Sequence, residues 1–244
     1  MTEVCYNGSF AGFLRLFKEA VLTGAAPDRV RREGPVTLFD GDTDDGGFFV
    51  GFRTRFPEAA DAVLHAWLSE FPIEPDILAY GAAVQRDPAA GADRGCAPAA
   101  TVLEAAYKTA HETDRLRGFL RFAPSRSPGT DGVWLARCAP DHLALPCLAP
   151  HFSARFGASP WAVIDEKRAL CLSRLGGEDA ILRPLEESPF AEKPPPQEPG
   201  ADPWEAIWCR YHRAITNETR RNPRLQRSFL PLRYWHYLPE MQAR

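Results

Sequence analysis

The sequence has 244 residues, of which 45% are hydrophobic and 25% are charged. These fractions are ordinary for a globular protein, and they exclude a largely disordered chain, a collagen-like repeat and a long coiled coil. The formal net charge of -3 provides no overall attraction to nucleic acid or to an anionic membrane, so any site for a polyanion has to be local.

The first third of the chain is predicted to be mainly helical. Residues 4–10 favour a short strand that turns at Asn7-Gly8 into a helix, because apolar side chains then recur at helical spacing. The Asp- and Gly-rich stretch 40–49 lacks the glutamate that closes a calcium-binding loop, and we predict a solvated turn there. Two further helices are expected within 57–83, separated by Pro72 and Pro75.

The middle of the chain alternates between helix and strand. Residues 99–117 carry the clearest helical pattern, and Gly118 is placed to end that helix. Two strands, a helix and two more strands are expected after it, at 119–123, 133–138, 140–157, 160–165 and 168–174. This order predicts an α+β fold: an antiparallel ββαββ sheet region with flanking helices and a C-terminal helical segment.

We expect one α+β domain over 1–183, with a helical N-terminal part and a sheet from about residue 118. Seven prolines within 184–203 predict an extended linker after it. The segment 204–244 carries eight arginines and three glutamates, and apolar side chains repeat at helical spacing along its first part. That stripe comprises Trp204, Ile207, Trp208, Tyr211 and Ile215. We expect this basic, aromatic C-terminal helical segment to pack on the domain through the stripe.

The sequence offers no motif for a catalytic centre or a cofactor. The GxSxG, P-loop and GxGxxG signatures are all missing. His111-Glu112 begins like the HExxH zinc motif, but Arg115 occupies the position of the second histidine. The six cysteines follow neither zinc-site nor iron–sulfur cluster spacing. We therefore expect no bound cofactor and no metal ion, and the catalytic residues stay unknown.

Neither a membrane segment nor a secretory signal is predicted. The sequence has no run close to the roughly 18 apolar residues that a spanning helix requires. The first ten residues also lack the basic-then-apolar order of a signal peptide. We expect a cytoplasmic protein without a membrane partner.

Arginines and aromatic residues alternate near the end of the chain, from Arg220 to Tyr237. Phosphate contacts require cations and base stacking requires aromatic rings, so this composition suits nucleic-acid binding. The alternative is an amphipathic segment whose aromatic side chains dock into the domain while its arginines remain solvated. The two interpretations are compatible with each other.

Several short motifs also occur together along the chain. They are Tyr6-Asn7-Gly8-Ser9-Phe10 with Phe13, Leu68-Ser69-Glu70, Gly118-Phe119-Leu120-Arg121-Phe122, His151-Phe152-Ser153-Ala154-Arg155-Phe156, Trp161-Ala162-Val163-Ile164-Asp165 with Lys167-Arg168, and Arg221-Asn222-Pro223-Arg224-Leu225-Gln226 with Pro231, Arg233-Tyr234-Trp235 and Glu240. In combination they resemble the bacterial "probable DNA metabolism protein" family over nearly the whole chain. The region 37–56 departs from the family pattern.

This resemblance implies DNA repair or modification. Proteins of that family are paired with a putative radical S-adenosylmethionine (SAM) DNA modification or repair protein, and the same domain occurs fused to uracil-DNA glycosylase-like domains. Because this chain has neither the cluster cysteines nor a recognisable glycosylase loop, the resemblance implies an accessory, DNA-handling protein. It implies no catalytic residues.

Together these observations predict an accessory DNA-binding protein that acts with one of those partners. The residues expected to contact DNA are Arg117, Arg121, His151, Arg155, Arg220, Arg221, Arg224, Gln226, Arg233 and Trp235. The alternative is a metal-dependent hydrolase or nuclease acting on nucleic acid, built from His111, His151, Asp165 and His236. Convergence of three of these four side chains on one point would favour the enzyme, whereas dispersed histidines beside a continuous basic groove would favour the binding protein.

Overall fold

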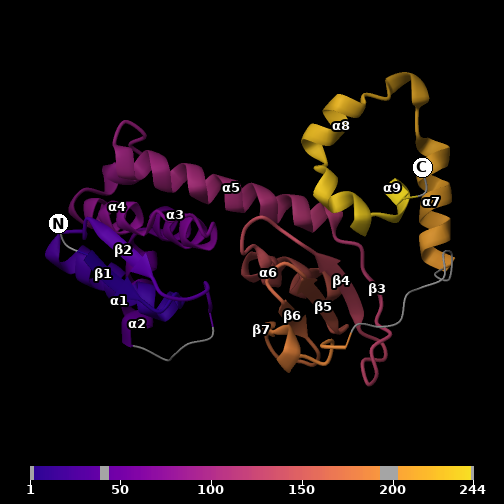
Figure 1. The fold of residues 1–244 in the computed structure, drawn as a ribbon, viewed down its shortest axis with the longest axis horizontal. Helices are drawn as coiled ribbons and strands as arrows, with labels where there is room; N and C mark the ends of the chain where they lie inside the picture. The colour runs from indigo at the N-terminus through magenta and orange to yellow at the C-terminus, as the bar shows by residue number, and fades with distance from the viewer. Residues whose placement is uncertain (1–2, 39–43, 193–202, 243–244) are drawn as a thin grey trace. The chain divides into compact units, whose positions relative to one another are not determined.

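The computed structural model describes residues 3–38, 44–192 and 203–242. The chain forms two compact units (Figure 1). The first unit comprises residues 1–114 and 141–144, and the second comprises residues 115–140 and 145–244. The division falls inside helix α5 (Ala97–Phe119), so this helix contributes residues to both units.

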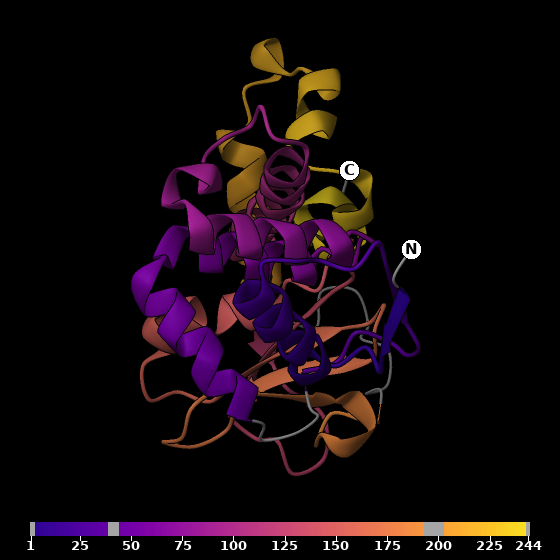
Figure 2. The ribbon, with the colours of Figure 1, turned by 90° about the vertical axis from the view of Figure 1, so that its left-hand side faces the viewer.

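The first unit is mainly helical and contains a two-stranded sheet. Its elements are β1 (Glu3–Tyr6), α1 (Phe10–Thr23), β2 (Arg29–Arg32), α2 (Asp44–Arg55), α3 (Pro57–Leu68), α4 (Glu74–Arg86), the 3-10 helix η1 (Pro88–Gly91) and most of α5. Strands β1 and β2 pair in parallel, with α1 as the connection between them. Helix α1 packs against both α2 and α4 (Figure 2).

The strand, turn and helix predicted at the start of the chain are confirmed. Ser9 caps α1 with its side chain, since Ser9 Oγ accepts a hydrogen bond from the Gly12 amide at 3.0 Å. Gly8 has a φ of 86°, and a Cβ at this position would lie 2.3 Å from the Pro35 carbonyl oxygen. Only glycine fits this turn without moving the backbone.

Aromatic side chains form the core of the first unit. Phe13 and Phe17 on α1 are fully buried, and the Phe17 ring meets those of Phe49 and Phe52 edge-on, at 5.7 and 5.1 Å between centroids. The solvated turn predicted at 40–49 is therefore wrong for 44–49, because these residues begin α2 and carry an aromatic ring into the core. Residues 39–43 lie outside the described residues.

The short segment 141–144 belongs to the first unit because of Glu112. This carboxylate is buried and accepts hydrogen bonds from the backbone amides of Asp141 and His142, at 2.9 and 2.8 Å. The Leu143 amide also donates to the Leu68 carbonyl at 3.0 Å. The glutamate of the HExx sequence therefore has a structural role inside the unit.

The second unit contains the sheet. Its elements after α5 are β3 (Ala123–Pro124), β4 (Trp134–Cys138), α6 (Leu145–Phe156), β5 (Trp161–Asp165), β6 (Leu170–Arg174), β7 (Ile181–Pro184), η2 (Leu185–Glu187), α7 (Pro203–Ile215), η3 (Glu218–Arg220), α8 (Pro223–Phe229), η4 (Leu232–Tyr237) and α9 (Pro239–Gln242). The strand order is β3-β4-β5-β6-β7. All neighbours are antiparallel except β4 and β5.

The predicted α+β class is confirmed, and the sheet differs from the predicted antiparallel ββαββ region in three respects. Strands β4 and β5 are parallel because α6 connects them, and a helical crossover returns the chain in the same direction. A fifth strand, β7, pairs with β6. The first strand is also shorter than expected, because α5 continues to Phe119.

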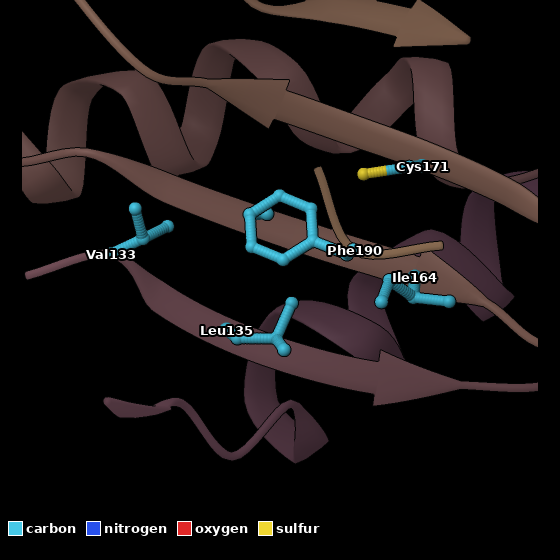
Figure 3. Packing of buried hydrophobic residues seen from close by; sticks show 6 residues of the cluster. Val133, Leu135, Ile164, Cys171 and Phe190 are labelled. Carbon is cyan, nitrogen blue, oxygen red and sulfur yellow. The ribbon is translucent and has the colours of Figure 1, made fainter. Parts of the chain in front are cut away.

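Strand β5 is buried over its full length, between two layers. On one face, Phe152 of α6 contacts Trp161, with 5.8 Å between the ring centroids. On the other face, the Phe190 ring lies over the strands among Val133, Leu135 and Ile164 (Figure 3). Since Phe190 lies beyond β7, the chain after the last strand completes the core.

This packing changes the start of the linker predicted at 184–203. Pro184 is the last residue of β7 and pairs with Leu170. Phe190 is only 1% exposed, so the residues up to this point are part of the folded unit. Residues 193–202 lie outside the described residues.

The C-terminal segment is attached to its unit mainly by side chains outside the predicted stripe. Tyr234 and Leu238 are buried, and the Tyr234 ring lies 5.5 Å from that of Phe119. Trp204 and Tyr211 on α7 are 69% and 54% exposed. The expectation that the α7 stripe is buried is thus wrong, because residues of η4 supply the packing instead.

None of the described helices is both long and apolar enough to cross a bilayer.

Candidate nucleic-acid interface

The second unit has a surface pocket of about 470 Å³. The residues around it come from the end of α5 and the chain that follows, from the start of β4, from the end of α6 and from α7. They are Gly118, Leu120, Arg121, Phe122, Trp134, Arg155, Phe156 and Trp208. The pocket thus combines four aromatic side chains with two arginines.

An aromatic cluster connects the sheet core to the pocket. Phe152 and Phe156 lie one turn apart on α6, so both face the same side of this helix. Phe152 is fully buried, while Phe156 is partly exposed at the pocket. Phe122 packs edge-on against both rings, at 4.9 and 4.8 Å between centroids. The core therefore fixes the positions of the two phenylalanines that line the pocket.

The two tryptophans of the pocket are more exposed. Trp134 is the first residue of β4, and strand alternation places its side chain opposite that of the buried Leu135. Trp134 is 36% exposed and Trp208 is 38% exposed. Both rings therefore offer apolar surface to solvent at the pocket.

Arg121 and Arg155 have different surroundings. Arg121 Nη2 lies 2.6 Å from Glu240 Oε1, and its Nη1 donates to the Gly118 carbonyl at 2.9 Å. The same guanidinium lies 5.4 Å from the centre of the Trp208 ring. Arg155 is exposed in the last turn of α6, with its guanidinium 6.0 Å from the Phe156 ring. Arg155 is thus the better placed of the two to bind an anion.

Arg117 adds positive charge near His151 and Arg155. Desolvation, followed by the positive charges of Arg117 and Arg155, lowers the pKa of His151 from its ordinary 6.5. This effect requires that the three side chains lie within electrostatic range of one another. Three of the residues predicted to contact DNA, Arg117, His151 and Arg155, therefore lie within electrostatic range of one another on a protein of net negative charge.

The C-terminal candidates fall into two groups, and among the described residues neither group lines the pocket. The first group is exposed. Arg220 is the last residue of η3, Arg221 follows it directly, and Arg224 lies on α8. Their role in DNA binding stays a prediction.

The second group makes contacts within the C-terminal segment. The Trp235 indole donates to the Leu230 carbonyl at 3.0 Å, and the Arg233 guanidinium lies 4.8 Å from the Tyr234 ring. Gln226 Nε2 lies 3.6 Å from Met241 Sδ. All three side chains are partly buried, which indicates that they stabilise the segment's own fold.

The residues of the alternative metal site have separate environments. His111 stacks on Tyr107, and His236 lies against Tyr237. Asp165 is buried and accepts hydrogen bonds from the amides of Lys167 and Arg168 as well as from the Arg168 guanidinium. Within the described parts of the chain, no three His, Cys, Asp or Glu side chains gather closely enough to hold a metal ion.

Sequence reasoning did not assign Phe122, Trp134, Phe156 or Trp208 to the site. Trp208 is predicted to serve packing as part of the stripe, Trp134 is included only as part of a strand, and Phe156 only as part of a motif. Strand alternation does not predict the exposure of Trp134, because this residue shares its strand face with Ala136 and Cys138, which are buried. The convergence of all four rings depends on tertiary contacts.

The fold and the pocket define an α+β protein with an aromatic, arginine-containing surface site on its sheet unit. Residues 75–240 match the model of a family described as a domain of unknown function, DUF4130. Since the match covers more than half of the chain, the protein belongs to this family. The matched region includes every residue that lines the pocket. No curated protein and no solved structure matches the chain.

Proposed function

We propose that this protein is an accessory DNA-binding protein in DNA repair or modification, and that it binds DNA through the pocket of its second unit. The observation that carries the proposal is the presence of an exposed arginine, Arg155, among four aromatic side chains in one pocket. Phosphates attract cations and bases stack on aromatic rings, so nucleic acid is the ligand that uses both features.

The charge around the pocket supports an anionic ligand. The formal net charge is -3, yet the exposed Arg117 and Arg155 both lie within electrostatic range of His151 and form a local positive cluster. A guanidinium can donate two parallel hydrogen bonds to one phosphate, which makes arginine well suited to this contact. The cluster therefore provides the local attraction that the overall charge does not.

The motifs shared with the "probable DNA metabolism protein" family support DNA as the nucleic acid. They also support a radical SAM protein or a uracil-DNA glycosylase-like protein as the partner. Among the described residues around the pocket, only Arg121 and Arg155 have ionisable side chains. Because arginine stays protonated and is a poor general base, we assign the chemical step to the partner.

Binding to labelled DNA across a salt series tests this function. We expect the affinity to fall steeply with salt, and we expect Arg155→Ala to flatten the log-log slope by roughly 0.9 on duplex DNA or 0.7 on single strands. Fluorescence anisotropy gives both quantities. Arg15→Ala is a matched control, since it removes an exposed arginine from α1 in the other unit.

Two results would contradict the proposal. One is a folded wild-type protein that binds no DNA at low salt. The other is an Arg155→Ala variant whose affinity and salt slope equal those of the wild type and of Arg15→Ala.

A further inference from the structure

We propose that the pocket and the exposed face of α7 bind a single-stranded segment of nucleic acid by stacking its bases on aromatic side chains. This inference rests on the proposed function and specifies its ligand. The first observation behind it is that four aromatic side chains of the second unit are exposed. Trp134, Trp208, Tyr211 and Trp204 are 36%, 38%, 54% and 69% exposed, and all four belong to the second unit.

Exposed rings are of little use to a protein that binds intact duplex. The bases of a duplex cover one another, so an aromatic side chain reaches a base face only when that base is unpaired or flipped out. Unpaired bases offer their faces to any ring, whatever the base. The exposed tryptophans therefore favour a single strand over a duplex.

The pocket is large enough to hold a base. Its volume of about 470 Å³ lies in the range of small-molecule pockets. Trp208 is held at the pocket by the Arg121 guanidinium, 5.4 Å from its ring, and Arg121 is itself held by Glu240 at 2.6 Å. A ring positioned before binding loses little conformational freedom when a base stacks on it.

Helix α7 extends this aromatic surface beyond the pocket. Trp204, Trp208 and Tyr211 are spaced by four and three residues, so they follow one face of the helix. The Trp208 and Tyr211 ring centroids are 5.9 Å apart. Successive bases of one strand can stack on such a series, with one base in the pocket and its neighbours along α7.

The charge of the segment and of the pocket favours an anionic occupant for this face. Residues 204–244 carry eight arginines and three glutamates, and Arg155 lies at the pocket. An anionic strand complements this excess of positive charge, whereas an apolar stripe on a partner protein does not require it. We therefore assign the exposed face to nucleic acid.

Three labelled probes of one sequence test the assignment with the full-length protein. They are a single strand, the matching duplex, and the same single strand with abasic sites at its centre. We expect the single strand to bind more tightly than the duplex, and the abasic strand to bind more weakly than the intact one although their phosphates are the same. Fluorescence anisotropy gives the three affinities.

Variants then locate the stacking. Loss of one stacking ring should weaken single-strand binding by about 5-fold to 150-fold, so we expect this range for Trp208→Ala and for Trp134→Ala. Tyr107→Ala is the control, since it removes a ring that is 64% exposed in the first unit. If Trp208→Ala does not fold, Trp134→Ala and Tyr211→Ala carry the same test.

The outcomes separate this inference from the proposed function. If the duplex and the abasic strand bind as tightly as the intact strand, the single-strand assignment is wrong and DNA binding stands. Full binding by the folded tryptophan variants would show that these rings do not stack on bases and would overturn the inference. If none of the probes binds, both proposals fall.

Discussion

Two arginines at one pocket have different roles because their surroundings differ. Arg121 forms an ion pair with Glu240 and hydrogen bonds to the Gly118 carbonyl, so much of its donor capacity is used inside the protein. Its guanidinium also lies over the Trp208 ring. Arg155 is exposed, and its guanidinium lies by the ring of Phe156. We infer that Arg121 positions the pocket and that Arg155 contacts the ligand.

His151 should report the binding of phosphate through its pKa. In the free protein, desolvation and the charges of Arg117 and Arg155 hold this pKa below 6.5. A bound phosphate stabilises the charged imidazole and raises the pKa, so binding takes up a proton. We expect the affinity for DNA to rise as the pH falls through the interval between the free and bound pKa values.

NMR titration of the imidazole protons measures both pKa values of His151. In the Arg155→Ala variant without DNA, the loss of a positive neighbour should raise the pKa of His151 toward 6.5. A pKa that stays the same when DNA is bound would show that the phosphate lies elsewhere.

At the scale of elements, the Arg121–Glu240 ion pair connects α9 to the chain after α5. Glu240 is only 6% exposed. Burial is the largest single effect and acts to raise its pKa, but hydrogen bonds from Arg121, Trp208 and the backbone, together with the charge of Arg121, outweigh it, and the pKa lies below the ordinary 4.5. A carboxylate with a lowered pKa stabilises the folded state above its unfolded pKa and loses this contribution as the pH falls through the folded value.

We therefore expect Glu240→Gln to lower the free energy of unfolding by about 1 to 3 kcal/mol at pH 7. The difference from the wild type should shrink as the pH falls below 4.5. Urea denaturation at neutral and acidic pH measures both effects. The matched control is Glu218→Gln, whose exposed 3.5 Å ion pair with Arg221 should contribute less than about 1 kcal/mol. Equal stability of Glu240→Gln and the wild type at pH 7 would contradict this account.

The sequence predicts most elements of the fold, because apolar spacing and capping residues act locally. Ser9, for example, starts α1, and the paired helices at 57–83 are present as α3 and α4. The parallel pairing of β4 with β5 is harder to predict from the sequence, since it depends on the path of α6. The stripe on α7 likewise indicates an amphipathic helix without indicating what covers it.

At the scale of the whole molecule, the site combines residues that are far apart in the chain. The sequence singled out Arg121 and Arg155, and the structure places both at one pocket. The sequence alone does not identify Trp134 and Trp208 as neighbours of these arginines, because their proximity requires β4, α6 and α7 to be assembled in one unit. The pocket lies within the region matched by the family model, whereas residues 3–74 lie outside that region.

The most direct test of the central claim is to determine which residues contact DNA. A single-stranded oligonucleotide that carries photoreactive 5-iododeoxyuridine can be irradiated with the full-length protein, and the crosslinked peptides can be identified by mass spectrometry. We expect crosslinks at Trp134, Phe122, Phe156 or Trp208, and we expect unlabelled single strand to compete with them. Crosslinks confined to the first unit, or none despite measurable DNA binding, would contradict the assignment of the pocket as the DNA site.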